Sequence, residues 1–153
     1  MVMEATIRVR RLNNEFEQSV QDTDFLSSVN IIEGDIGKWQ VRFKDECMPD
    51  FLRHLVICMK FPIDYPFKPP QISIPNIFHP NVYSTGSLCI SILEERSKLL
   101  PGSEDLKFSC WRPSLSVLNV LIGVKSVLED PNTDSPANIA ASKLYLRYLE
   151  YQC

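Results

Sequence analysis

The 153-residue chain lacks long hydrophobic runs, a basic excess and an apolar leader segment. Its unbroken apolar runs, such as 55–59 and 120–122, are far shorter than the ~18–20 residues that span a membrane. Its 16 basic and 19 acidic residues give a net charge of −3, whereas nucleic-acid-binding proteins usually carry a basic excess. The N-terminus has an acid at Glu4 and no apolar stretch, so we expect no secretory signal. We therefore expect neither a membrane span nor nucleic-acid binding.

Cysteine and histidine are too few, and too widely spaced, for a metal or disulfide framework. No two of the five cysteines form a C-x-x-C pair, and there are two histidines, so a structural zinc site is not expected. The odd cysteine count favours a reducing compartment, and we expect a cytoplasmic and nuclear location. A glycine-rich phosphate loop is also absent, so ATP binding by this chain is not expected.

The hydrophobic pattern indicates one α+β domain over residues 1–153. It predicts a helix over 1–20, strands at 29–33, 39–43, 55–61 and 72–74, and helices at 117–129 and from 136 onward. The expected buried stripes of the helices are Val9, Leu12, Phe16 and Val20, then Leu118, Leu121, Ile122 and Val124, then Ile139, Ala140, Leu144 and Tyr148. Because the helices lie outside the block of strands, we expect a four-stranded antiparallel meander.

Several local signals refine this outline. Ser116 and Ser135 are predicted helix N-caps, and Pro136 suits a first helical position. The continuous apolar run at 55–61 indicates a strand buried on both faces. The polar, aperiodic segment 94–110 predicts a long irregular segment, which in a compact domain is usually functional or mobile.

Cys89 is the candidate nucleophile. It follows a glycine turn and lies outside any long predicted element, whereas Cys58 lies within a predicted strand, as core cysteines usually do. The preceding segment 79–81 predicts a turn, in which His79 bonds the backbone and Pro80 fixes φ. The Asn81 amide could donate to the oxyanion that forms when an amine attacks a cysteine thioester.

Five segments, in order and spacing, resemble the ubiquitin-conjugating enzyme family: 65–70, 79–81, position 89, 111–113 and 130–132. The resemblance implies the UBC fold and a transferase that accepts ubiquitin from an activating enzyme as a thioester on Cys89. The ubiquitin then passes to a substrate lysine with the help of a RING- or HECT-type ligase. Because thioester exchange conserves the activated bond, no cofactor is expected here, and ATP is used by the activating enzyme.

The resemblance also implies roles for residues around the nucleophile and on the surface. Asn81 matches an asparagine that supports the oxyanion. Active-site support is implied for His79, Tyr65 and Ser135, and partner binding for Arg10, Arg11, Phe67, Pro113 and Ser114. For the two arginines, a solvated helix face is the alternative.

Two departures from the family pattern leave questions open. The long segment 94–110 resembles a subgroup with an acidic loop whose members build ubiquitin chains, but here it is only weakly acidic, and a solvated loop is the alternative. The segment 111–113 also resembles conjugating enzymes for other modifiers, so a modifier of the NEDD8 or SUMO type remains an alternative to ubiquitin. Many members continue into a fourth helix, so we expect a C-terminally shortened form of the fold.

Two other functions compete with this interpretation. A non-catalytic ubiquitin-binding variant of the same fold is disfavoured because Cys89 and Asn81 are both present. A cysteine hydrolase would need a histidine base within hydrogen-bonding reach of Cys89. The two candidates are His54 and His79, and the turn already explains His79.

Overall fold

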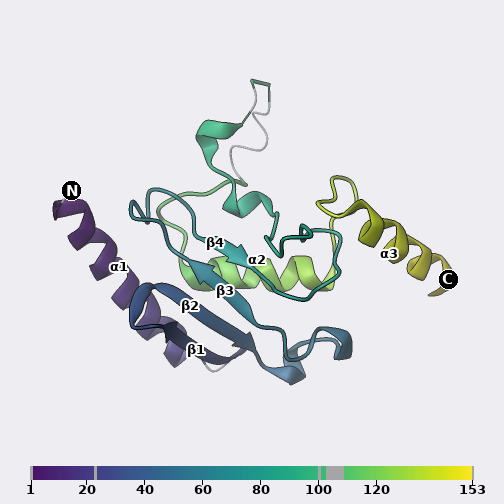
Figure 1. Ribbon diagram of the computed structural model, residues 1–153, viewed down its shortest axis with the longest axis horizontal. Helices are drawn as coiled ribbons and strands as arrows, with labels where there is room; N and C mark the ends of the chain where they lie inside the picture. The colour runs from purple at the N-terminus through teal and green to yellow at the C-terminus, as the bar shows by residue number, and fades with distance from the viewer. Residues whose placement is uncertain (1, 23, 100, 103–108, 153) are drawn as a thin grey trace.

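The computed structural model describes residues 2–22, 24–99, 101–102 and 109–152. The elements are the helix α1 (Val2–Gln21), the strands β1 (Leu26–Ile32), β2 (Asp35–Phe43), β3 (Ile57–Lys60) and β4 (Gln71–Ser73), and the helices α2 (Val117–Glu129) and α3 (Ile139–Gln152). The four strands form one antiparallel sheet in the order β1-β2-β3-β4. Figure 1 shows α1 beside β1 and β2, α2 running along the sheet, and α3 extending away at the C-terminal end. The predicted α+β meander is confirmed.

The core lies between one face of the sheet and the helices α1 and α2. On β2, Trp39, Val41 and Phe43 are all buried, as their alternation predicts. The Trp39 ring makes an edge contact with Phe16 of α1, with ring centroids 5.4 Å apart, and lies 4.7 Å from the Phe61 ring. These contacts hold α1 against the sheet.

The buried face of α1 differs from the predicted stripe. Val9 and Val20 are 43% and 54% exposed, so the prediction is wrong for both. The face that is buried instead carries Leu12, Glu15 and Ser19, and Ser19 satisfies its hydroxyl by donating to the Glu15 carbonyl at 2.7 Å. Apolar spacing alone does not reveal a helix face that is buried through polar residues.

The predicted two-sided burial of the third strand is also wrong. On β3, Ile57 and Met59 are buried, but Cys58 is half-buried and Lys60 is exposed. This alternation arises because one face of β3 points to the core and the other to solvent. The apolar run continued through Cys58, which is why the strand appeared fully buried.

Helix α2 occupies the predicted range, with Ser116 as its N-cap. The Ser116 hydroxyl accepts from the Asn119 amide at 3.1 Å, and the Asn119 side chain accepts from the Ser116 amide at 3.0 Å. Ile122, predicted to be buried, is 54% exposed. The residues of this helix that are buried are Val117, Val120, Leu121, Val124 and Leu128.

Helix α3 begins later than predicted and exposes the predicted stripe. Its first residue is Ile139, and Asn138 caps it by accepting from the Ala141 amide at 3.0 Å, so the predicted Ser135–Pro136 start is wrong. All four residues of the predicted stripe are exposed. The helical period is real, but the helix extends away from the sheet that would cover this face (Figure 1).

The described part of the segment after Cys89 includes the short 3-10 helices η3 (Ser91–Leu93) and η4 (Arg96–Lys98). The prediction of an irregular segment holds for 94–99, 101–102 and 109–110, and its remaining residues lie outside the described part of the chain. Among the residues that the structure describes, no helix is long and apolar enough to cross a membrane.

Candidate functional site

A tight turn and a short bridge position Cys89. Gly86 adopts a φ of 89°, which favours glycine, and its amide donates to the Tyr83 carbonyl at 2.8 Å. The Cys89 amide then donates to the Asn81 carbonyl at 2.9 Å. This bond ties the nucleophile to the 79–81 turn. The Cys89 side chain is half-buried at the edge of a groove.

His79 is buried, and both ring nitrogens have partners. Nδ1 accepts from the Asn81 amide at 3.1 Å, so Nε2 is the protonated nitrogen and donates to the Leu128 carbonyl at 3.3 Å. Burial lowers the pKa of the imidazole and keeps it neutral. His79 is thus bonded within its own turn and to α2, and is not oriented as a base for Cys89. The other histidine, His54, is exposed and lies 3.4 Å from Asp45.

The buried Asn81 side chain joins two loops of the site. Its Nδ2 donates to the Asn132 carbonyl at 2.8 Å, and its Oδ1 accepts from the Asn132 amide at 2.9 Å. Nδ2 carries a second hydrogen that can serve another acceptor. The segment around Asn132 is therefore held beside the 79–81 turn, to which the Cys89 amide is bonded.

Cys89, Asn81 and Ser135 line one groove of about 470 Å³. The structure therefore brings three of the predicted site residues together in one groove. Two exposed carboxylates, Glu94 and Asp130, also line the groove and were not singled out. An acidic groove beside the thiol attracts cationic groups.

Tyr83 is a further residue that sequence reasoning missed. A hydrogen-bonding interaction with Cys89, followed by the charge of its thiolate, raises the pKa of Tyr83. The Tyr83 hydroxyl therefore stays protonated at neutral pH and can act as a hydrogen-bond donor. The one available signal was its place in the turn just before the cysteine.

The resemblance led us to expect that Tyr65 supports the active site, but Tyr65 is not among the residues that line the groove. It is buried in the core, where its ring packs 4.9 Å from Phe61 and 5.9 Å from Trp111, measured between centroids. Its hydroxyl lies 3.3 Å from Glu15 Oε1. Burial, followed by the Glu15 charge, raises the pKa of Tyr65, so its hydroxyl stays protonated.

The two arginines of α1 are in different environments. Arg11 bonds internally, with Nε 2.6 Å from Glu15 Oε1 and Nη2 donating to the Leu115 carbonyl at 2.8 Å. Arg10 is exposed and lines a surface hollow on α1. The geometry therefore leaves Arg10 available to a partner and commits Arg11 to the fold.

The residues expected to face ligases gather on a second surface. Phe67 is 59% exposed and shares a hollow of about 410 Å³ with Pro113, while Ser114 is exposed nearby in the sequence. Trp111 fixes the two loops together, because its Nε1 donates to the Pro66 carbonyl at 2.8 Å. Within the described residues, no cluster of histidine, cysteine and carboxylate side chains could hold a metal ion.

Comparison with known sequences decides the family. The family model described as ubiquitin-conjugating enzyme matches residues 11–152. The chain belongs to the ubiquitin-conjugating enzyme family. The predicted family, fold and transferase class are thereby confirmed. Membership implies ubiquitin, an activating enzyme and a ligase as the classes of partner.

Individual relatives support the assignment. The chain is similar to Ubiquitin-conjugating enzyme E2 2 of Fusarium solani, with 37% identity over 145 residues that cover 92% of this chain and 85% of the relative. The protein of the same name from Trichoderma harzianum is also 37% identical over 145 residues, with the same coverage. Ubiquitin-conjugating enzyme E2-34 kDa of Saccharomyces cerevisiae is 48% identical over 88 residues, which cover 57% of this chain and 29% of that relative.

Proposed function

We propose that this conjugating enzyme carries ubiquitin as a thioester on Cys89 and transfers it to a substrate lysine. The observation that carries the proposal is the groove in which the half-buried thiol lies with Asn81 and two carboxylates. A cysteine hydrolase with His79 as its base is disfavoured because both ring nitrogens of His79 form hydrogen bonds with other groups.

Loading is an exchange of thioesters. The Cys89 thiolate attacks the carbonyl carbon of the thioester on the activating enzyme, and a new C–S bond forms as the old one breaks. The activating-enzyme sulfur leaves as a thiolate and takes up the proton that Cys89 lost. The protonated Tyr83 hydroxyl, whose pKa is raised by Cys89, is the donor that we assign to the attacking thiolate.

Discharge transfers the acyl group to nitrogen. A neutral lysine amine attacks the thioester carbon, the C–S bond breaks, and Cys89 departs as a thiolate while the amine loses a proton to water. Glu94 and Asp130 attract the lysine into the groove as a cation, which gives up one proton to water before the neutral amine attacks. The second Nδ2 hydrogen of Asn81 serves the oxyanion of the intermediate. Ser135, on the groove lining, supports the position of the incoming amine.

Partner binding is assigned to surfaces away from the groove. Arg10 on α1 is the exposed basic contact for the activating enzyme. Phe67, Pro113 and Ser114 form the surface for a RING- or HECT-type ligase.

The chain needs no cofactor of its own, because the activating enzyme uses the ATP. We expect it to act in the cytoplasm and nucleus.

A loading assay on a non-reducing gel tests the proposal. The chain is mixed with ATP and, in separate reactions, with the activating enzymes and modifiers of the ubiquitin, NEDD8 and SUMO types. We expect a reductant-sensitive band with ubiquitin, which Cys89→Ala abolishes and Cys58→Ala, at the half-buried cysteine of β3, retains. A band with another modifier reassigns the modifier. A band that survives Cys89→Ala refutes the assigned nucleophile.

A further inference from the structure

The hollow that contains Phe67 and Pro113 also contains the beginning of the long segment. Three parts of the chain meet there, at positions 64–68, 95–97 and 111–113. Trp111 joins them, since its Nε1 donates to the Pro66 carbonyl at 2.8 Å and its amide donates to the Glu94 carbonyl at 2.9 Å. These hydrogen bonds therefore make the start of the long segment an ordered part of this surface.

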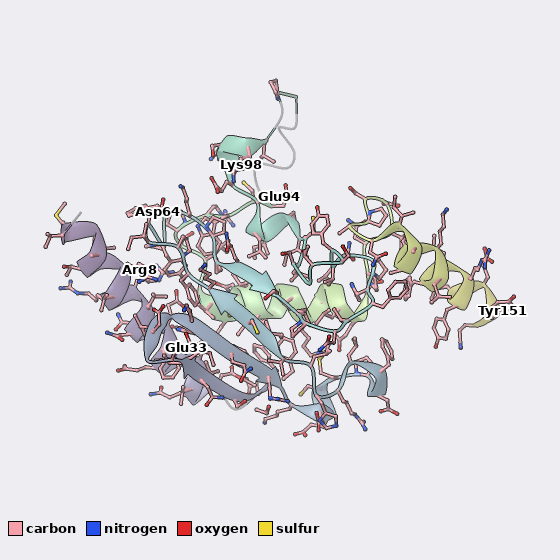
Figure 2. All side chains as sticks on the ribbon, in the orientation of Figure 1. Arg8, Glu33, Asp64, Glu94, Lys98 and Tyr151 are labelled. Atoms are coloured by element: carbon pink, nitrogen blue, oxygen red, sulfur yellow. The ribbon has the colours of Figure 1, made fainter. Side chains whose placement is uncertain are left out.

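The carboxylates at this surface already have partners within the chain. Asp64 lies 3.0 Å from Lys68 Nζ, and Glu95 lies 2.9 Å from Lys98 Nζ. The hydrogen bond and charge of Asp64, and then the charge of Glu95, raise the pKa of Lys68. Figure 2 shows Asp64 and Lys98 at the same end of the molecule, above the sheet.

Two guanidinium groups in the hollow have no such partner among the residues that the structure describes. Arg96 comes from η4 and Arg112 from the segment after Trp111, and both are exposed. Neither forms an ion pair or side-chain hydrogen bond with any residue in the described ranges. The hollow therefore presents two guanidinium cations beside the apolar side chains of Phe67 and Pro113. An arginine fork binds a carboxylate through two hydrogen bonds, which makes it selective for such a partner.

We propose that this hollow takes a ligase domain with an acidic face, whose apolar side chain contacts Phe67 and Pro113 and whose carboxylates pair with Arg96 and Arg112. The proposal rests on the ligase surface of the proposed function and adds the chemistry of the partner. It also gives the long segment a role, because Arg96 makes it a determinant of which ligase binds. Charge complementarity at an interface acts mainly on specificity and association rate.

Discharge of the ubiquitin thioester tests the proposal. The loaded chain is mixed with free lysine, alone or with purified RING domains that carry either acidic or basic residues beside their apolar contact. We expect acidic-faced domains to accelerate discharge and Arg96→Glu/Arg112→Glu to lower this acceleration by about tenfold or more. Loading and unstimulated discharge should stay unchanged. The matched control is Arg147→Glu, an exposed arginine on α3.

The direction of the charge effect decides the outcome. An acidic-to-basic swap on the stimulating RING domain should restore the double variant, and rising salt should weaken stimulation of the wild type more than of the variant. Equal stimulation by basic-faced domains, no stimulation by any acidic-faced domain, or an equal loss in Arg147→Glu overturns the proposal. If the chain fails to load at all, the proposed function fails instead. Calorimetric titration of the unloaded chain with the same domains then tests whether acidic-faced domains bind more tightly than basic-faced ones and whether the double variant loses this binding.

Discussion

Glu15 offers a sharp test of the structure, because a single buried carboxylate joins three elements. Its Oε1 accepts from Arg11 Nε at 2.6 Å and lies 3.3 Å from the Tyr65 hydroxyl, and its Oε2 accepts from the Val117 amide at 2.8 Å. Val117 is the first residue of α2, where an amide has no partner inside the helix. A carboxylate there also interacts favourably with the helix dipole.

We expect Glu15→Gln to lower the free energy of unfolding by about 2–4 kcal/mol. Glutamine has nearly the same shape as glutamate, but its amide nitrogen must face one of the donors from which the carboxylate accepted a hydrogen bond. A buried donor without an acceptor costs roughly 1–3 kcal/mol, and the loss of a charge-assisted bond adds to this. Glu15→Ala removes every acceptor and should cost about 3–5 kcal/mol.

Thermal and urea unfolding monitored by circular dichroism measure this effect. For a chain of this size, 1 kcal/mol corresponds to about 2–4 °C, so Glu15→Gln should lower Tm by about 5–15 °C. Glu17→Gln, at an exposed position of the same helix, is the matched control and should change stability by less than about 0.5 kcal/mol. Equal Tm values for the two glutamine variants would refute the reasoning. Because Glu15 is not among the residues lining the groove, loading at low temperature should persist.

Three further predictions concern residues near Cys89 in the chain. Tyr83→Phe removes the hydroxyl that interacts with Cys89 and should slow alkylation of this thiol at pH 7 by about 2–10-fold, measured with iodoacetamide. Asn81→Ala should leave loading intact and slow discharge to free lysine by about 100-fold, because an oxyanion donor is lost. Burial lowers the pKa of His79, so the unfolded chain takes up a proton that the folded chain does not, and stability should fall as the pH drops below about 6.5.

Each of these predictions has an outcome that contradicts it. An unchanged alkylation rate in Tyr83→Phe would show that the hydroxyl does not act on the sulfur. If Asn81→Ala loses loading and discharge together, its effect is on the loop around Asn132 rather than on the oxyanion. For His79, an imidazole that becomes charged in the folded protein at pH 6.5, followed by NMR, would contradict the neutral state.

Features that depend on neighbouring residues could be predicted from the sequence. Ser116 and its cap bonds to Asn119 lie within one helical turn, so the helix 117–129 was correct at both ends. Alternation in β2 identified its buried face for the same reason, because side chains in a strand alternate between the two faces. The turn before Cys89 and the bonds of His79 to its own turn are similarly local.

Features that depend on distant parts of the chain could not be predicted. Whether a helix face is covered is decided by what packs there, so Val9 and Ile122 are exposed despite their helical spacing. Glu15 is buried because Tyr65 and Val117 bring donors from far along the chain. No local pattern reveals such an acceptor.

Whether a feature could be predicted depends on how far apart in the chain the interacting residues lie. Residue types and short spacings were enough to predict the family, the candidate nucleophile Cys89 and the order of the helices and strands. The folded arrangement was needed to show that Tyr65 belongs to the core, that Arg11 bonds internally, and that Arg96 and Arg112 share one hollow. Burial and charge compensation are set by groups that approach through folding, and such contacts leave no periodic signal in the chain.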